Sequence, residues 1–197
     1  MKFVLATNNP KKLKEMSEIL SGLGVEVVSP KELGIYLEVE ETGTTFAENA
    51  MLKAKAICEA AKLPAIADDS GLCVDALNGG PGVYSARYGG EGLDDQGRYQ
   101  LLLSSMRGQT TRAAHFASAI ACAFPNGDTI EAEGKVEGTI AFAPMGEGGF
   151  GYDPMFFYPP MKKTFGQMTA EEKHAISHRG KAVREFIEKL REYYADK

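Results

Sequence analysis

Hydrophobic and polar residues follow two periods along the chain, one typical of strands and one typical of helices. Short apolar runs typical of strands occupy residues 2–6, 25–28, 65–68 and 72–77, with a possible further strand at 36–39. Two longer runs of this type, 113–124 and 129–141, flank Pro125-Asn126-Gly127-Asp128, a sequence typical of a hairpin turn. The second run therefore returns antiparallel to the first.

Four segments carry apolar residues at helical spacing. These helices are expected from Pro10 to Gly22 or Gly24, from Thr45 to about Lys62, and over residues 94–106 and 179–194. Asn8 or Asn9 can cap the first helix, and Ser177 can cap the last. Thr45 and Glu48 have the spacing of a capping box. Strands and helices together predict an α/β protein.

The length of 197 residues allows one large domain or two small lobes that share a sheet. Hydrophobic residues make up 44% and charged residues 25%, so a sizeable core needs neither a disulfide nor a structural metal. The sequence contains no repeat, low-complexity tract or linker. We therefore expect residues 1–197 to form a single α/β domain with no independent second domain.

The net charge of −5 argues against broad nucleic-acid binding, which requires a basic face. Cys58, Cys73 and Cys122 are odd in number and lack Cys-x-x-Cys spacing, so they are interpreted as reduced thiols rather than a zinc site. The apolar run at the N-terminus is too short for a signal peptide, and no run has the length of a membrane span. We expect a cytoplasmic protein with no membrane or nucleic-acid partner.

Two adjacent carboxylates follow the apolar run at 65–67, in Asp68-Asp69-Ser70-Gly71. Aspartate often caps a turn, and a Ser-Gly turn is expected here. Burying two carboxylates is also costly unless a cation compensates them, and a hard divalent ion is a suitable partner. Both interpretations fit this sequence when it is considered alone.

The connection between the first strand and the first helix contains polar residues suited to an anion. Its residues are Thr7, Asn8, Asn9, Pro10, Lys11 and Lys12. Backbone N–H groups at a helix N-terminus and the helix dipole favour negative charge, and lysines add to this effect. The segment lacks the glycines of a P-loop, and an ordinary capped helix with solvated lysines is the alternative.

Further groups elsewhere in the chain have complementary chemistry. Glu40, Glu41, Asp68 and Asp69 could hold Mg²⁺, and Lys53 could join the anion-binding turn. An aromatic segment, Phe150-Gly151-Tyr152-Asp153, offers a ring for stacking and a carboxylate, while Lys173, His178 and Arg179 offer cationic donors. A core phenylalanine and a solvated helix start are the ordinary alternatives for the last two groups. His178 and Arg179 lie at the positive end of a helix, which an anionic or carbonyl-bearing ligand would compensate. Together these groups indicate a magnesium-dependent nucleotide enzyme.

The same residues resemble the inosine triphosphate pyrophosphatase family, also called the Ham1 or RdgB-like non-standard purine nucleoside triphosphate pyrophosphatases. The resemblance covers nearly the whole chain and rests on six ordered matches. These are residues 5–12, 41–50, 67–72, 81–88 and 148–154, and Glu172-Lys173 with Ser177-His178-Arg179. The turn reads Thr-Asn-Asn-Pro where many members have Thr-Gly-Asn, so a slightly different backbone approach to phosphate is expected here.

The resemblance implies an elongated, two-lobed α/β fold with a central mixed sheet flanked by helices and an active-site cleft between the lobes. It also implies a homodimer that hydrolyses ITP, dITP and XTP to the monophosphate and pyrophosphate. One Mg²⁺ ion per subunit is the implied cofactor, with Mn²⁺ as a substitute.

Carried over by position, the resemblance assigns the triphosphate to residues 7–12 and Lys53. Asp69 would accept the proton of the attacking water and bind the metal with Glu41, supported by Asp68 and Glu40. The remaining substrate contacts would come from Ser70, Phe150, Gly151, Tyr152, Asp153, Lys173, His178 and Arg179. In this assignment Phe150 stacks on the base, and Asp153 with the last three residues bonds the sugar or the base edge.

Two other functions are considered. A Maf-like pyrophosphatase would act on modified pyrimidine or standard nucleotides, and a substrate panel would distinguish it. A nucleotide sensor or RNA-binding module would bind without turnover, although the acidic charge disfavours RNA. The complete set of catalytic residue types favours an enzyme.

Overall fold

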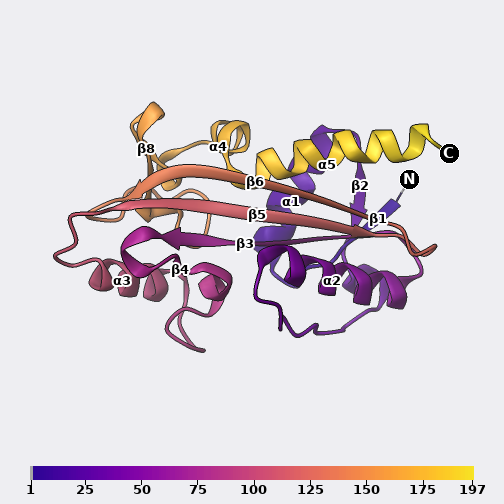
Figure 1. Cartoon of the computed structure of the whole chain (residues 1–197), viewed down its shortest axis with the longest axis horizontal. Helices are drawn as coiled ribbons and strands as arrows, with labels where there is room; N and C mark the ends of the chain where they lie inside the picture. The colour runs from indigo at the N-terminus through magenta and orange to yellow at the C-terminus, as the bar shows by residue number, and fades with distance from the viewer. Residues whose placement is uncertain (1) are drawn as a thin grey trace. The chain divides into compact units, whose positions relative to one another are not determined.

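The computed structural model describes residues 2–197, and its centre is a mixed eight-stranded sheet (Figure 1). The strands are β1 (Lys2–Leu5), β2 (Glu26–Val28), β3 (Ala65–Val74), β4 (Gly80–Pro81), β5 (Ala113–Ala123), β6 (Thr129–Ile140), β7 (Phe156–Tyr158) and β8 (Lys163–Thr164). Their order is β2-β1-β3-β5-β6-β7-β8, with β4 paired to β3. Strand β1 is parallel to both neighbours, whereas β7 is antiparallel to β6 and β8. The expected α/β class with a mixed sheet is confirmed.

Five α-helices flank the sheet. They are α1 (Pro10–Gly22), α2 (Phe46–Ala61), α3 (Asp95–Ser105), α4 (Ala170–Ile176) and α5 (His178–Ala195). The Thr45 hydroxyl caps α2 by accepting from the Glu48 N–H, as expected, but the Glu48 carboxylate accepts from the N–H of Thr44. The reciprocal half of the predicted capping box is therefore wrong. Within residues 2–197, no helix combines the length and apolar character needed to cross a membrane.

The chain forms two compact units. Unit 1 contains residues 1–69, 118–134 and 178–197, and unit 2 contains residues 70–117 and 135–177. The interpretation of residues 1–197 as a single domain stays a prediction.

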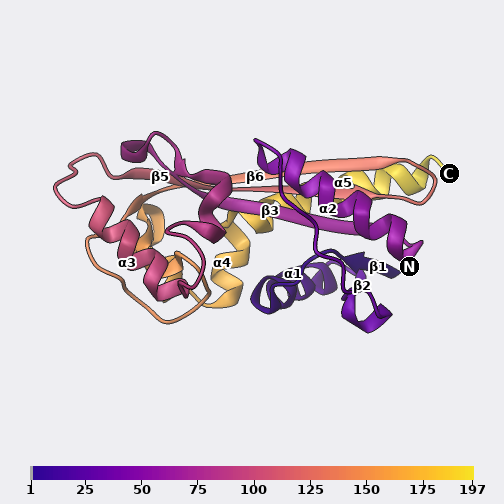
Figure 2. The same cartoon turned by 90° about the horizontal axis from the view of Figure 1, so that it is seen from below.

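Unit 1 places helices on both faces of its part of the sheet (Figure 1). On one face, Met16 of α1 and Phe186 of α5 pack with Ile66 of β3. On the other face, Ala50 and Ala54 of α2 pack with small residues of β1, β3 and β5. Figure 2 shows α1 beside β1 and β2, which its contacts with β2 support. Small side chains let α2 approach the sheet closely.

Unit 2 has an aromatic core. The rings of Phe116, Phe156 and Phe165 contact one another, with centroids 4.6–5.5 Å apart. Leu102 of α3 packs in the same cluster together with Leu72 of β3. The aromatic run after residue 155, which carried no predicted element, therefore forms strand β7 and anchors this core.

Three predictions of local structure are wrong. Asp68-Asp69-Ser70-Gly71 forms no turn, because β3 runs without interruption from Ala65 to Val74. The predicted strand at 72–77 therefore merges with its predecessor, and its last residues form a 3₁₀ turn. Residues 36–39 form no strand. Helix α4 was not predicted, since its seven residues are too few to establish a period.

Candidate active site

Strand β3 directs its two acidic side chains to opposite faces of the sheet. Side chains alternate along a strand, and Ile66 packs on the α1–α5 face, whereas Ala65 and Ala67 pack on the α2 face. By this alternation Asp68 belongs to the first face and Asp69 to the second. The two adjacent carboxylates are therefore in different environments.

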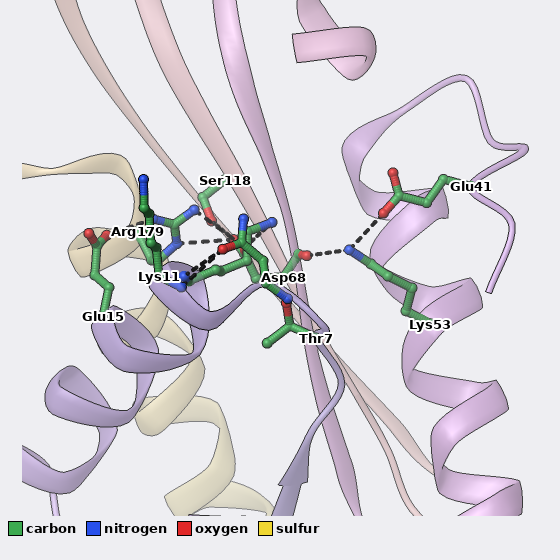
Figure 3. A network of polar contacts seen from close by, with 10 residues as sticks. Thr7, Lys11, Glu15, Glu41, Lys53, Asp68, Ser118 and Arg179 are labelled. Carbon is green, nitrogen blue, oxygen red and sulfur yellow. Dashed lines mark hydrogen bonds and ion pairs between the residues drawn. The ribbon is translucent and has the colours of Figure 1, made fainter. Parts of the chain in front are cut away.

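Asp68 lies in a buried network of charges on the α1–α5 face (Figure 3). Its carboxylate is 3.0 Å from Lys12 Nζ and 3.4 Å from Arg179 Nη2, and it accepts a 2.7 Å hydrogen bond from Ser118 Oγ. Arg179 Nη1 reaches Glu15 at 2.6 Å. The cations of Lys12 and Arg179 therefore compensate the buried carboxylate of Asp68.

This network keeps Asp68 ionised. Burial opposes the charge of Asp68, but Arg179, Lys12, Lys53 and Ser118 outweigh burial and hold its pKa well below its usual range. Burial lowers the pKa of Lys12, and Asp68 opposes that effect. Asp68 thus acts as a fixed negative charge and not as a proton acceptor.

On the α2 face, Lys53 connects Glu41, in the loop before α2, to β3 (Figure 3). Its Nζ is 3.0 Å from Glu41 Oε1 and donates a 2.7 Å hydrogen bond to the backbone carbonyl of Asp68. Lys53 and Glu41 both act on Asp69, the first lowering its pKa and the second raising it. Glu41 and Lys53 thus pair with each other, and the charges of both act on Asp69.

Asp69 combines burial with an unsatisfied oxygen. The residue is 5% exposed, and its Oδ2 has no hydrogen-bond partner within the described residues. Burial, together with the charges of Glu41 and Asp68 and against those of Lys53 and Lys12, raises the pKa of Asp69 to about 6. A carboxylate with this pKa can accept a proton near neutral pH.

The surroundings of Asp69 also fit a divalent cation. An orphaned carboxylate oxygen beside a second carboxylate, Glu41, is the donor set that a hard cation compensates. Among residues 2–197, no group of three or more His, Cys, Asp or Glu side chains is arranged to hold an ion. The remaining ligands would then be water and substrate phosphates, as is usual for Mg²⁺. Glu40 is exposed on the loop before α2, and its expected role stays a prediction.

The turn between β1 and α1 differs from the anion site that was expected. Asn9 is the cap, and its Oδ1 accepts from the N–H groups of Lys11 and Lys12 at 3.0 and 3.3 Å. Pro10 has no N–H group. Asn9 therefore already satisfies the N–H groups of Lys11 and Lys12, contrary to the expectation that they face a ligand, while the expected triphosphate contacts of residues 7–12 stay predictions. Lysine side chains and the helix dipole remain as the attraction for phosphate.

The start of α5 is not an uncompensated basic surface. Arg179 is 2% exposed, and its pKa, which burial would lower, is raised by Asp68 and Glu15. His178 is also buried. The solvated-helix alternative is therefore wrong, and internal carboxylates supply the compensation that was expected from a ligand.

The remaining predicted substrate residues lie in unit 2. Ser70 continues β3, and Tyr152 donates a 2.5 Å hydrogen bond from its hydroxyl to the carbonyl of Ser85. Buried Asp153 accepts from the Phe150 N–H at 3.0 Å and from Lys173 Nζ at 2.7 Å. The Lys173 Nζ also lies 5.0 Å from the centre of the Phe150 ring. Unit 2 thus combines a half-buried aromatic ring with a buried ion pair.

Gly149 and Gly151 provide a matched pair of substitutions in this segment. Both have positive φ, 70° and 62°, so alanine is strained at either position by about 1 kcal/mol. A Cβ on Gly149 would collide with the Asp153 carboxylate, whereas a Cβ on Gly151 would meet no atom within 4 Å. Urea unfolding should therefore show at least twice the loss of stability for Gly149→Ala as for Gly151→Ala. Equal losses would contradict the close packing of Asp153 against Gly149.

Two residues of the unit 1 network were not predicted. Glu15 precedes the apolar Met16 on α1, and Ser118 lies within an apolar strand. Their partners are far away in sequence, at positions 179 and 68. In the sequence, only the position of Glu15 next to the apolar residues of α1 could have indicated that this charged residue is buried.

Comparison with known proteins gives one consistent result. The model of the Ham1 family matches residues 3–189. A dITP/XTP pyrophosphatase of Desulforamulus reducens is 52% identical over 196 residues, covering 98% of both chains. The Staphylococcus aureus Ham1 protein superposes with a TM-score of 0.87 at 41% identity, covering 98% of this chain and all of that one. A nucleoside-triphosphatase or dITP/XTP pyrophosphatase from Mycobacterium abscessus gives a TM-score of 0.75 at 45% identity, covering 94% and 98% of the two chains.

Proposed function

The chain belongs to the Ham1 family, and on this basis we propose that it is an enzyme that hydrolyses non-standard purine nucleoside triphosphates to the monophosphate and pyrophosphate. The substrates are dITP and XTP, which name the curated relatives, and ITP, which shares the hypoxanthine base of dITP. One observation carries the proposal from the structural side. The orphaned oxygen of Asp69, with its raised pKa, lies beside fixed cations in unit 1.

In the proposed reaction Asp69 accepts a proton from water. The water oxygen forms a bond to the α-phosphorus, the α–β phosphoanhydride bond breaks, and pyrophosphate leaves with the electron pair. Lys12 and Lys53 attract the triphosphate, and Asp68 holds Lys12 in place through their 3.0 Å contact. Positioning and electrostatics supply most of the rate enhancement in phosphoryl transfer.

A divalent ion, Mg²⁺ or in its place Mn²⁺, completes the proposed site. Asp69 and Glu41 would hold it, with Asp68 and Glu40 contributing through charge or water. When bound, such an ion neutralises phosphate charge and lowers the pKa of a bound water. Support comes from the donor set around Asp69.

Base recognition is assigned to unit 2. Phe150 would stack on the purine, while Asp153 and Lys173 would bond its polar edge, and Ser70, Gly151 and Tyr152 would make further substrate contacts. Donors directed at a 6-keto oxygen would face another donor in adenine, and an unpaired buried donor is costly. Guanine keeps the 6-keto group, so its rejection must involve the 2-amino position. The proposed contacts of His178 and Arg179 with sugar or base stay predictions.

A homodimer with a cytoplasmic location is part of the same proposal, and its partners are small nucleotides rather than nucleic acid. The family match supports the Ham1-type activity over the Maf-like alternative. A sensor that binds nucleotide without turnover is disfavoured by the presence of an available proton acceptor, Asp69.

A product assay tests the proposed function. Purified protein with Mg²⁺ should convert ITP, dITP and XTP to monophosphate and pyrophosphate. It should act about 5- to 150-fold more slowly on ATP, because one unpaired buried polar group costs about 1–3 kcal/mol. It should also act more slowly on GTP. Chromatography identifies the nucleotide product, and pyrophosphate is assayed with and without an added inorganic pyrophosphatase. Orthophosphate as the first product, or equal rates on ATP and ITP, would refute the proposal. A chelator should abolish turnover, and Mn²⁺ should restore it.

A further inference from the structure

Helix α3 places a carboxylate against the backbone of the segment Phe150–Asp153. Asp95, the first residue of α3, accepts a 2.9 Å hydrogen bond at Oδ2 from the N–H of Gly151. The two residues are 56 positions apart in sequence and both belong to unit 2. No property of α3 itself requires this contact.

Asp95 is not the cap of its helix. The preceding residue, Asp94, is the N-cap and accepts from the Gly97 N–H at 2.7 Å through its Oδ1. Asp95 lies one position later, and the recorded contact of its carboxylate is with another segment. The two adjacent aspartates therefore have different roles: Asp94 caps α3, and Asp95 binds the segment that contains Gly151.

The contact completes the restraint of two consecutive backbone amides. The N–H of Phe150 is bound by Asp153, and the N–H of Gly151 is bound by Asp95. The next residue, Tyr152, is fixed through its hydroxyl to the carbonyl of Ser85. Hydrogen bonds from a backbone N–H to a charged acceptor are stronger than neutral ones, so the peptide planes on either side of Phe150 are firmly oriented.

The orientation of these planes fixes the direction of the Cα–Cβ bond of Phe150, from which the ring projects. Gly151 has φ of +62°, a region in which glycine has no steric preference to hold it. Without an external acceptor, the Gly151 peptide could rotate and carry the ring with it. A restraint from α3 removes that freedom before a ligand binds, and such preorganisation improves affinity.

We propose that Asp95 is a positioning residue that fixes the Phe150 ring for stacking on the purine base. The inference rests on the proposed function for the role of Phe150, and it adds a residue outside that site. Because the contact of Asp95 is with the segment assigned to base binding and not with the residues assigned to proton transfer, its loss should affect KM rather than kcat.

The test compares three variants in steady-state hydrolysis of ITP. Asp95→Ala should raise KM about tenfold with kcat changed less than threefold, in line with the loss of one hydrogen bond to a charged group. Asp95→Asn keeps an oxygen acceptor and should restore KM to within about threefold of the original protein. Asp94→Ala removes the true cap and weakens α3 without touching Gly151, so its KM should not change. Asp95→Ser replaces Asp95→Ala if the alanine variant fails to fold.

An unchanged KM in Asp95→Ala, or an equal rise in Asp94→Ala, would overturn the inference. Amide hydrogen exchange in ¹⁵N-labelled protein gives a readout that does not depend on activity. Exchange at Gly151 should accelerate in Asp95→Ala and not in Asp94→Ala. If the original protein fails to hydrolyse ITP, the proposed function fails, while the exchange at Gly151 still decides whether Asp95 fixes the segment.

Discussion

Replacement of Asp69 by asparagine is expected to lower kcat for ITP by about 10²–10⁴-fold, the range for loss of a general base. The amide has nearly the same shape but cannot accept the proton of water at neutral pH. Its oxygen also binds a cation more weakly than a carboxylate does. Steady-state kinetics at pH 7–9 measure the loss, and a kcat within tenfold of the original protein would remove Asp69 from the proposed role.

The same substitution should stabilise the metal-free protein near neutral pH. Burial raises the pKa of Asp69 from 3.8 to about 6, so the ionised group opposes folding by up to about 3 kcal/mol above that pH. The sign follows from linkage: a carboxyl whose pKa is higher in the folded protein favours folding below pH 4, and this contribution is lost as pH rises to 6. Asp69→Asn should therefore gain stability at pH 7–8 and lose that advantage below pH 4.

Chemical denaturation with a chelator present measures this gain. Glu41→Gln is the matched control, because it removes a half-buried carboxylate that already pairs with Lys53. Its pH-dependent gain in stability should be smaller than that of Asp69→Asn, because burial, the largest cause of the raised pKa of Asp69, remains. A lower stability of Asp69→Asn than of the original protein at pH 8 would contradict this prediction. It would mean that the ionised Asp69 carboxylate does not oppose folding.

Replacement of Arg179 by methionine is expected to cost about 3–5 kcal/mol of stability, the cost of removing one partner from a buried ion pair. The side chain is 3% exposed, and its loss removes the 2.6 Å ion pair with Glu15 and the 3.4 Å ion pair with Asp68. Methionine retains much of the volume, so the loss would report charge rather than a cavity. Urea unfolding at pH 7 provides the measurement.

Acid should reduce the difference between Arg179→Met and the original protein. Asp68 has a depressed pKa in the folded protein, so its contribution is complete above about pH 4 and declines as pH falls further. Arg191→Met is the control, because Arg191 pairs with Glu188 at 3.4 Å on an exposed face of α5. That variant should be nearly neutral. A cost below about 1 kcal/mol for Arg179→Met would contradict the buried network.

The sequence was sufficient to predict the class of fold and most of the elements, because the apolar spacing of α1, α2 and α5 and the hairpin between β5 and β6 are strong local signals. The same approach failed at β3. There a Ser-Gly pair has the composition of a turn, yet the strand continues through it from Ala65 to Val74. Pairing with neighbouring strands overrode the local preference.

Candidate residues were predicted from chemistry, but their partners were not. The pairing of Arg179 with Glu15 joins positions 164 apart, and no local pattern records such a contact. For the same reason the sequence assigned Arg179 to a ligand when its recorded partners are internal carboxylates. The distinction between Asp68 and Asp69 likewise required knowledge of which helices cover each face of the sheet.

In strand β3, the number of residues between Ala65 and Asp68 decides which face each acid points to, whatever those residues are. Loss or gain of one residue there would turn the following side chains over, so each acid would face the other's surroundings. Asp68 would lose its contact with Arg179, and Asp69, the proposed proton acceptor, would take its place beside Arg179. A deletion of one codon in this strand would thus exchange an inert charge and a reactive one without changing either amino acid.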